Sequence, residues 1–239
     1  MTTDRPIIFK APMIRAILDG QKTQTRRIMK PQPYQSGIEC KATNMGAGTW
    51  RLGALAHAGI GDDWKCPYGV PGEQLWVRET HCFETNFNLD VDYDPPFNDG
   101  RPIKRDSAPE WGEWWTQCHY RATDPTPDLA YDDVEGPHCR WRSSTTMPKW
   151  AARIWLEITS VRVERVQDIS KHDCFSEGVT EEKLLGRQVY PCPKGPHAMG
   201  DHALAPCPER AFAAIWDDIN GSGAWDRNDW VWVIEFRRV

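Results

Sequence analysis

The chain lacks any long apolar run. No window of its 239 residues holds the roughly 18 consecutive apolar residues that a membrane-spanning helix requires. Its first residues also lack the apolar core of a secretory signal peptide. We therefore expect a cytoplasmic protein that has no membrane partner.

The motifs of several large enzyme classes are missing as well. The sequence contains no Gly-rich phosphate loop, no HExxH zinc helix and no GxSxG nucleophile elbow. Internal repeats and low-complexity tracts are also absent. Any catalysis must therefore come from another set of polar residues, and we expect it to need no cofactor.

Regular apolar periodicity is confined to a few short segments. The 19 Pro and 18 Gly residues cluster in stretches without periodicity, which predicts long irregular insertions at about 31–70, 84–148 and 180–206. Between the insertions, short strands and helices follow one another without a βαβ rhythm. We therefore expect one α+β domain spanning residues 1–239, built on a small mixed or closed antiparallel sheet.

The first half of the chain contains three predicted elements. Residues 7–9 form a short apolar strand, and residues 11–18 form a helix that has Pro in its first turn and Gly20 after its end. Residues 72–79 read as a turn that enters a strand, with Leu75 and Val77 on one face.

The second half contains four more. Apolar and polar residues alternate over residues 151–166, which predicts a long strand that is bent near 159–160. Ser170 and Asp173 resemble a capping box, which predicts a short helix that ends at Gly178. Residues 230–236 are apolar on both faces, which predicts a central strand. A helix from 208 to 220 presents one apolar face, formed by Phe212, Ile215, Trp216 and Ile219.

A basic segment at 20–27 follows the first helix and carries one amine, two hydroxyls and two guanidinium groups. Because Gly20 can end a helix in the left-handed conformation, we expect the segment to be irregular. Lys22 and Thr25 would meet if the segment forms a single turn, and an amine beside a hydroxyl can activate a nucleophile. The alternative is a solvated basic loop.

Charge is distributed unevenly along this acidic chain, whose net charge is -5. Residues 1–35 hold seven basic against two acidic residues, whereas residues 84–135 hold thirteen acidic against four basic residues. A local basic site in an acidic protein suits one anionic or nucleotide-sized ligand better than a long phosphate track. The 13 Trp residues permit stacking on nucleobases, although most are expected in the core or within the insertions.

Cysteine usage favours free or metal-binding thiols over a disulfide framework, which is typical of short secreted domains. Two of the eight Cys residues stand with two His residues in a Pro- and Gly-rich loop, at a spacing that matches no compact zinc finger. Two Cys and two His are nevertheless an acceptable structural zinc set. Its members would be Cys192, His197, His202 and Cys207.

Four segments stand out together: 14–27 with its Gly-x-Lys-Thr-x-Thr pattern, 71–77, 154–178 and 232–237. In sequence and in order they resemble the ASCH-domain proteins of the PUA-like superfamily. The resemblance implies a small β-barrel with flanking helices and an association with RNA or modified nucleosides. Residues 66–69 and 147–151 resemble the enlarged members found in tailed phages and prophages, which implies a bacterial host cell.

One enzyme in that family, the N(4)-acetylcytidine amidohydrolase, removes an acetyl group from the exocyclic amine of a modified cytidine. The resemblance carries its catalytic residues to Lys22, Thr25 and Glu177. A neutral Lys22 would take the Thr25 proton, whereas Glu177 would orient Lys22, move a proton or bind the substrate amine.

Substrate contacts are expected from the basic segment and from the strand at 72–79. One guanidinium of the basic segment is expected in the pocket, and the other in a structural role. The alternative role of Trp76 is core packing, and the alternative for Glu79 is a surface ion pair. The candidates are Thr23, Arg26, Arg27, Trp76 and Glu79.

The sequence thus leaves three functions open. The first is an amidohydrolase that acts on an acylated nucleoside such as N(4)-acetylcytidine. In the second, the same pocket binds a nucleotide or modified base, free or within RNA or DNA, without chemistry. In the third, the Trp-rich insertions of a phage protein bind another protein. The oligomeric state stays open.

Overall fold

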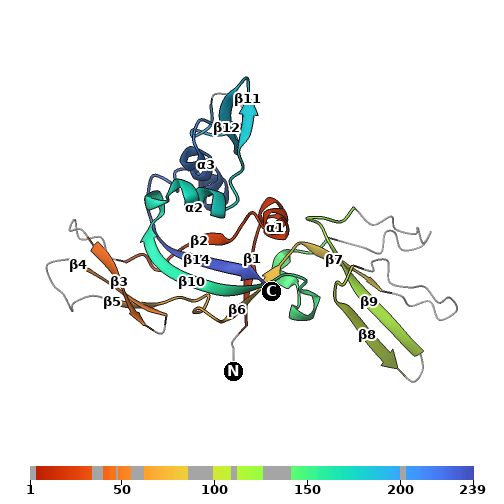
Figure 1. Cartoon of the computed structure of the whole chain (residues 1–239). Helices are drawn as coiled ribbons and strands as arrows, with labels where there is room; N and C mark the ends of the chain where they lie inside the picture. The colour runs from red at the N-terminus through yellow and green to blue at the C-terminus, as the bar shows by residue number, and fades with distance from the viewer. Residues whose placement is uncertain are drawn as a thin grey trace.

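The computed structural model describes residues 4–33, 40–46, 48–54, 62–85, 99–108, 112–125, 141–199 and 203–239. These residues form a mixed α+β fold in which strands predominate, as the pattern of short elements predicts. Figure 1 shows a central curved sheet with helices above it and three smaller sheets that project away from it.

The central sheet has five strands in the order β1-β6-β10-β14-β2. Its β1–β6 pair is parallel, and its other described pairs are antiparallel. Within the described residues β1 and β2 form its two edges, so this sheet is open and not closed into a barrel. The strands are β1 Arg5–Ile8, β2 Gln24–Ile28, β6 Gln74–Arg78, β10 Trp155–Arg165 and β14 Trp230–Arg238.

Strand β10 is bent, which confirms the prediction made from its sequence pattern. Its pairing with β14 shifts register between Ile158 and Ser160, so one extra residue is accommodated there. The first three residues of β10 also pair with β6, while the whole strand follows β14. The bend therefore gives the sheet the curvature that is visible in Figure 1.

Strand β14 is central and buried on both faces, as its unbroken apolar sequence predicts. Trp232 and Ile234 pack into a core cluster that includes Ile14 and Ile17 of the first helix. Val231 and Val233 point to the other face and pack into a second cluster. The strand therefore joins the two cores of the molecule.

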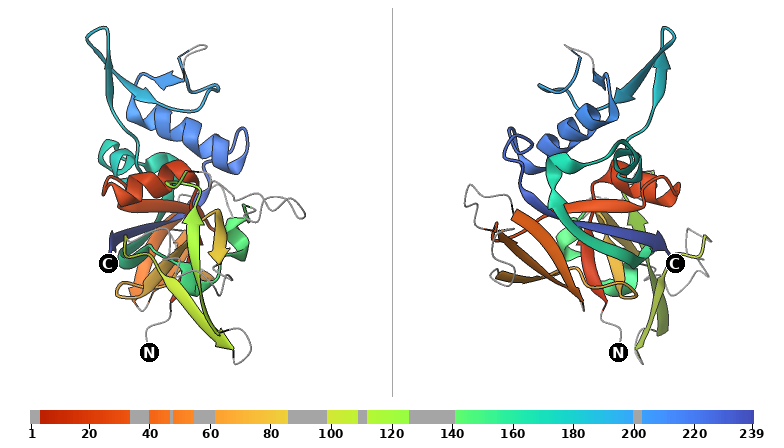
Figure 2. Two further views of the ribbon diagram at one scale, coloured as in Figure 1. Left: turned by 90° about the vertical axis from the view of Figure 1, so that its right-hand side faces the viewer. Right: turned by 60° about the vertical axis from the view of Figure 1, so that its left-hand side comes forward.

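Helix α1 packs against one face of the central sheet in the first cluster, whereas α2 and α3 pack against the other face in the second cluster. In both views of Figure 2 the helices lie away from the N-terminus. Ser170 caps the second helix, since its Oγ accepts a hydrogen bond of 3.1 Å from the Asp173 N–H. Gly20 and Gly178 follow the first two helices with positive φ, as their sequence positions predict. The helices are α1 Ala11–Leu18, α2 Lys171–Ser176 and α3 Pro208–Asn220.

The prediction that segment 20–27 is irregular is wrong for its second half, which forms strand β2. Thr25 pairs with Ile234, and Arg27 pairs with Trp232 of β14. The sequence pattern of β2 is polar and does not show the strand. Its backbone is ordered by pairing with a strand that lies more than two hundred residues further along the chain.

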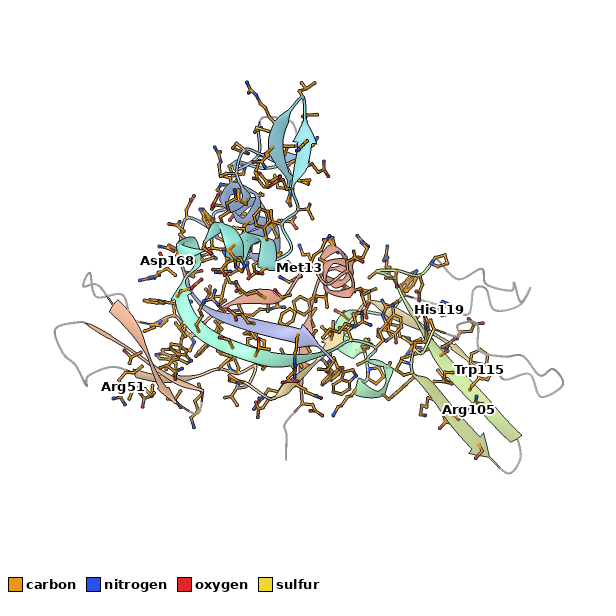
Figure 3. All side chains as sticks on the ribbon, in the orientation of Figure 1. Met13, Arg51, Arg105, Trp115, His119 and Asp168 are labelled. Atoms are coloured by element: carbon orange, nitrogen blue, oxygen red, sulfur yellow. The ribbon has the colours of Figure 1, made fainter. Side chains whose placement is uncertain are left out.

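The described parts of the insertions are only partly irregular, because each insertion also contributes strands to a three-stranded antiparallel sheet. Many of their residues are exposed, so apolar residues do not alternate clearly; β11, for example, is exposed along its whole length. Figure 3 shows Arg51 and Arg105 on two of these sheets, which project to opposite sides of the molecule. The strands are β3 Cys40–Gly46, β4 Thr49–Ala54 and β5 Asp62–Lys65; β7 His81–Thr85, β8 Ile103–Ala108 and β9 Gly112–Tyr120; and β11 Glu182–Leu184, β12 Arg187–Pro191 and β13 Leu204–Ala205.

Short 3-10 helices connect several of these elements. In the part of the chain that the structure describes, no helix has the length and apolar character needed to cross a membrane. The 3-10 helices are η1 Ser144–Thr146, η2 Lys149–Ala151 and η3 Val166–Asp168.

The close approach at Gly178 predicts that Gly178→Ala destabilises the protein. A Cβ there would lie 3.3 Å from the Cβ of Ala16 and 3.5 Å from that of Lys22, at a φ of 95°. The backbone conformation alone costs an L-residue roughly 1–2 kcal/mol. Gly186→Ala is a matched control, because its φ is 78° but its Cβ would meet nothing within 4 Å. Urea denaturation should show a larger loss of unfolding free energy for Gly178→Ala, and equal losses would contradict this packing.

Candidate functional site

A cavity of about 570 Å³ lies where the edge strand β2 meets helices α1 and α3. Ile14 of α1, Thr25 of β2 and Trp216 of α3 contribute to its wall. Glu177, which follows α2, lines it as well. The volume falls within the range of about 300–1,000 Å³ that is usual for small-molecule sites.

Lys22 and Glu177 form a buried ion pair beside this cavity. The Lys22 Nζ donates hydrogen bonds to Glu177 Oε2 at 2.7 Å, to the Glu177 carbonyl at 2.8 Å and to the Gln24 carbonyl at 2.7 Å. The Lys22 side chain is fully buried, and 4 % of the Glu177 side chain is exposed. Glu177 lines the cavity and Lys22 does not, so the carboxylate is the member of the pair that faces a ligand.

Backbone contacts hold the two partners together. The Lys22 N–H donates to the Ala16 carbonyl at 2.9 Å, which folds the chain back onto the end of α1. The Thr23 N–H donates to the Ser176 carbonyl at 2.9 Å, which joins this turn to the end of α2. The positive φ of Gly178 then lets the chain leave α2 directly against the Lys22 side chain.

Burial lowers the pKa of Lys22 from its ordinary value. The Glu177 carboxylate opposes this change, while the positive charges of Arg27 and Arg26 add to it. All three hydrogens of the Lys22 ammonium are used in hydrogen bonds. In this arrangement Lys22 is therefore a donor, with no free electron pair to accept a proton.

Arg26 is held by carboxylates on three sides. Its Nη1 donates to Glu177 Oε1 at 3.2 Å, and its Nη2 contacts Asp173 at 3.2 Å and also Glu164. The guanidinium lies 5.7 Å from the centre of the Phe212 ring. Because its side chain is fully buried and its charge is matched, Arg26 chiefly fixes the position of Glu177.

Arg27 differs from Arg26, because within the described residues it has no carboxylate partner. Its Nη2 donates to the Ile8 carbonyl at 2.5 Å, and its guanidinium lies 5.1 Å from the centre of the Phe9 ring. Burial lowers the pKa of Arg27. Arg27 and Thr25 are two residues apart on β2, so they share one face of the strand and both line the cavity.

The Thr25 hydroxyl completes the polar end of the cavity. Thr25 is buried, and within the described residues its hydroxyl has no hydrogen-bond partner. A ligand in the cavity would therefore meet a free hydroxyl, a carboxylate held by two cations, and a guanidinium without a counter-ion. This combination can bind a polar group and can also transfer a proton.

The remaining sequence-predicted contacts lie outside the cavity wall. Thr23 is exposed and joins β2 to its neighbours only through its backbone. Trp76 is buried in a separate cluster, where the Arg78 guanidinium lies 4.7 Å from its ring centre. Glu79 is fully buried in a two-pronged ion pair with Arg153, at 3.0 and 2.8 Å, and not in a surface pair.

Sequence reasoning missed the wall that α3 contributes. The sequence shows the apolar face of α3 without giving it a role in a site, and all four of its residues line the cavity: Phe212, Ile215, Trp216 and Ile219. The Trp216 indole N–H has no hydrogen-bond partner within the described residues. Ile219 is 36 % exposed in the structure, but its helical spacing in the sequence is the same as that of a core face, so no sequence signal marks this wall.

The expected zinc set is not assembled in the described residues, where no group of three or more metal-binding side chains occurs. His197 Nε2 lies 3.3 Å from an Asp217 carboxylate oxygen, and Cys192 is buried. His202 lies outside the described residues. Cys192 and Cys207 are free thiols, whereas Cys82 is disulfide-bonded, which the expectation of free thiols did not anticipate.

We compared the chain with known proteins in three ways. A scan against protein-family models, a search of curated proteins and a search of solved structures all return no match. The function must therefore be argued from the geometry of the cavity and from the residues that line it.

Proposed function

We propose that the protein is an amidohydrolase that removes an acyl group from the exocyclic amine of a modified cytidine, with N(4)-acetylcytidine as the test substrate. The observation that carries the proposal is the buried Lys22–Glu177 pair beside a cavity that Thr25 also lines. Lys22 and Glu177 are 155 positions apart along the chain, so their contact depends on the fold. The ASCH resemblance names the same three residues.

The proposal includes the fold family. We propose that the curved five-stranded sheet with α1 and α2 is the PUA-like core of an enlarged ASCH protein from a phage or prophage. The bent strand β10 and the turn that joins α1 to β2 support this assignment. A nucleoside substrate would place the activity in the cytoplasm of the bacterial host.

The chemistry begins with the Thr25 hydroxyl. Its oxygen attacks the carbonyl carbon of the acyl group while its proton passes to the Glu177 carboxylate, which lines the same cavity. The carbonyl electron pair moves onto oxygen and forms a tetrahedral oxyanion. When this intermediate collapses, the C–N bond breaks, the amine takes the proton from Glu177, and the acyl group remains on Thr25 as an ester.

Water completes the cycle. Glu177 takes a proton from the water as the water oxygen attacks the Thr25 ester, and the C–O bond to Thr25 then breaks as Glu177 returns that proton to the Thr25 oxygen. The products are the carboxylic acid, which ionises in solution, and the restored hydroxyl. Arg27 is the donor best suited to stabilise both oxyanions, since no carboxylate neutralises it and it shares a strand face with Thr25.

Lys22 positions the carboxylate in this scheme. Its three hydrogen bonds leave no electron pair for the Thr25 proton, and it does not line the cavity. Because Lys22 and Arg26 bind different oxygens of Glu177, the carboxylate is fixed in one orientation. A carboxylate accepts about four hydrogen bonds in total, so Glu177 retains capacity for the substrate proton.

The second candidate is a binding pocket without chemistry. It is favoured by Arg27, whose positive charge would suit a phosphate or the edge of a base. Its affinity for a nucleotide would fall as salt is added, because ion contacts are screened. Binding without turnover of any acylated nucleoside would favour this candidate over the enzyme.

The first prediction concerns turnover. Wild-type protein should release acetate from N(4)-acetylcytidine, and Thr25→Val or Glu177→Gln should lower kcat by a factor of about 100 or more, because each removes a group that takes part in bond making or proton transfer. Product formation followed by chromatography measures this. Thr25→Ser should keep part of the rate, because it keeps the hydroxyl.

The matched control for Glu177→Gln is Glu182→Gln, which changes an exposed carboxylate on β11. It should leave kcat unchanged. Circular dichroism and thermal unfolding would establish that each variant is folded. Turnover at the wild-type rate by a folded Glu177→Gln or Lys22→Ala protein would refute the enzymatic proposal.

The second prediction concerns pH. Burial lowers the pKa of Lys22, so the ammonium loses its proton at a pH below the ordinary lysine value of 10.5. If the ammonium is what holds Glu177, kcat/KM should fall as pH rises through that lowered pKa. Lys22→Arg, if active, should lose this alkaline limb, because arginine stays protonated there.

The pH profile also separates the two roles of Lys22. A rate that rises through the same range would identify neutral Lys22 as the base, in place of Glu177. The uncatalysed hydrolysis of the substrate at each pH must be measured in parallel and subtracted. Thermal unfolding at each pH would separate loss of activity from loss of fold.

A further inference from the structure

One end of the cavity, as we define it by the residues that line it, is formed by residues next to β7 and β9 and by η1, and not by the strands of the central sheet. Thr80, Arg121 and Ser144 all line this end. Thr80 immediately precedes β7, and Arg121 immediately follows β9. The three residues are far apart along the chain, so a specific arrangement of backbone must bring them to one place.

Backbone hydrogen bonds account for that arrangement. His81 pairs with Tyr120 in the β7–β9 sheet, and the Arg121 N–H donates to the Thr80 carbonyl at 3.0 Å. On the other side of β7, His81 and Arg142 exchange hydrogen bonds of 2.7 and 3.2 Å. The segment that leads to Ser144 is therefore held beside Thr80, two residues after Arg142.

Hydrogen bonds and an ion pair join the turn that carries Arg121 to its neighbours. Asp124 accepts a hydrogen bond of 2.7 Å from the Tyr120 N–H and an ion pair of 2.6 Å from Arg101. Arg15 of α1 donates to the Ala122 carbonyl at 2.8 Å. Arg121 is thus positioned relative to α1, which forms the adjacent part of the cavity wall.

The polar groups at this end lack partners inside the protein. Within the described residues, Arg121 forms no ion pair and lies 6.0 Å from the Trp141 ring, in a cation-π contact that leaves its N–H donors free. The Thr80 and Ser144 hydroxyls likewise have no hydrogen-bond partner among these residues. One guanidinium and two free hydroxyls are the donors that a phosphate group accepts.

We propose that this end of the cavity binds the phosphate of a mononucleotide, so that the substrate is an acylated cytidine monophosphate and not the free nucleoside. The choice of an acylated cytidine rests on the proposed function, whereas the phosphate site rests on the residues above. A single Arg with two hydroxyls matches one phosphate group. A polymer would require a row of such cations along the wall.

The cavity accommodates the rest of such a ligand. Much of the remaining wall is apolar or aromatic and includes Phe9, Met13 and Ile215. A base and a ribose would lie against this part of the wall, with the acyl group toward Thr25 and the phosphate toward Arg121. The insertion at 84–148 would therefore contribute to binding the phosphate, a role separate from that of the three proposed catalytic residues.

The experiment compares two substrates in two proteins. Wild-type kcat/KM should be about 10- to 100-fold higher for N(4)-acetylcytidine 5′-monophosphate than for N(4)-acetylcytidine, as expected for hydrogen bonds to a charged group. In Arg121→Ala the ratio of the two values should fall close to one. Thr80→Val combined with Ser144→Ala should lower the ratio in the same direction.

The control is Arg142→Ala, which removes a nearby guanidinium that does not line the cavity and should preserve the ratio. A wild-type ratio near one, or a ratio that Arg121→Ala leaves unchanged, would overturn the phosphate site. An oligonucleotide that contains N(4)-acetylcytidine and reacts as fast as the monophosphate would overturn the choice of a mononucleotide.

A binding measurement separates this proposal from the proposed activity. If no acylated cytidine is hydrolysed, isothermal titration with cytidine monophosphate and with cytidine still tests the phosphate site. Tighter binding of the monophosphate, lost in Arg121→Ala, would support the site while the enzymatic proposal fails. Equal binding of the two ligands would overturn it.

Discussion

The buried ion pair between Lys22 and Glu177 is the interaction on which the site depends. It fastens the turn after α1 to the end of α2, and it sets the orientation of the carboxylate that faces the cavity. Removing charges from water is costly, and attraction between the partners offsets that cost only when the remaining hydrogen bonds are made. In this protein the remaining hydrogen bonds are made. Lys22 also donates to the carbonyl groups of Gln24 and Glu177, and Arg26 donates to the second carboxylate oxygen of Glu177.

The surrounding charges divide into a matched set and an unmatched set. Arg26 is matched by Glu164, Asp173 and Glu177, and it is as deeply buried as Lys22. Arg27 and Arg121 line the cavity without a carboxylate partner among the described residues. Buried matched charges fix geometry, whereas unmatched charges at a cavity attract an anion. The two kinds of arginine therefore serve different purposes, although Arg26 and Arg27 are adjacent in the sequence.

Sequence patterns predicted the elements whose signals are local. The cap at Ser170, the positive φ at Gly178 and the burial of β14 on both faces all follow from residues within a few positions of each other. The bend in β10 likewise appears where its alternation changes. At these positions the conformational preference of the local sequence agrees with the tertiary packing, so the sequence pattern was enough to predict the structure.

Elements that depend on distant partners could not be predicted in this way. Strand β2 carries two adjacent arginines, and only its pairing with β14 gives it a strand conformation. The expected substrate contact Glu79 is occupied by Arg153, which no spacing indicates. The contact between Lys22 and Glu177 was anticipated only through the family resemblance, because 155 positions separate the two residues.

Among the three small sheets, the one formed by β7, β8 and β9 bears directly on the site. The loops at its base supply Thr80 and Arg121, whereas the other two small sheets contribute no residue to the described cavity wall. Arg121 is exposed, lines the cavity and has no ion-pair partner among the described residues. Under the two proposals made above, the base of this sheet would act on the choice of ligand, while the central sheet and its helices would supply the groups for chemistry.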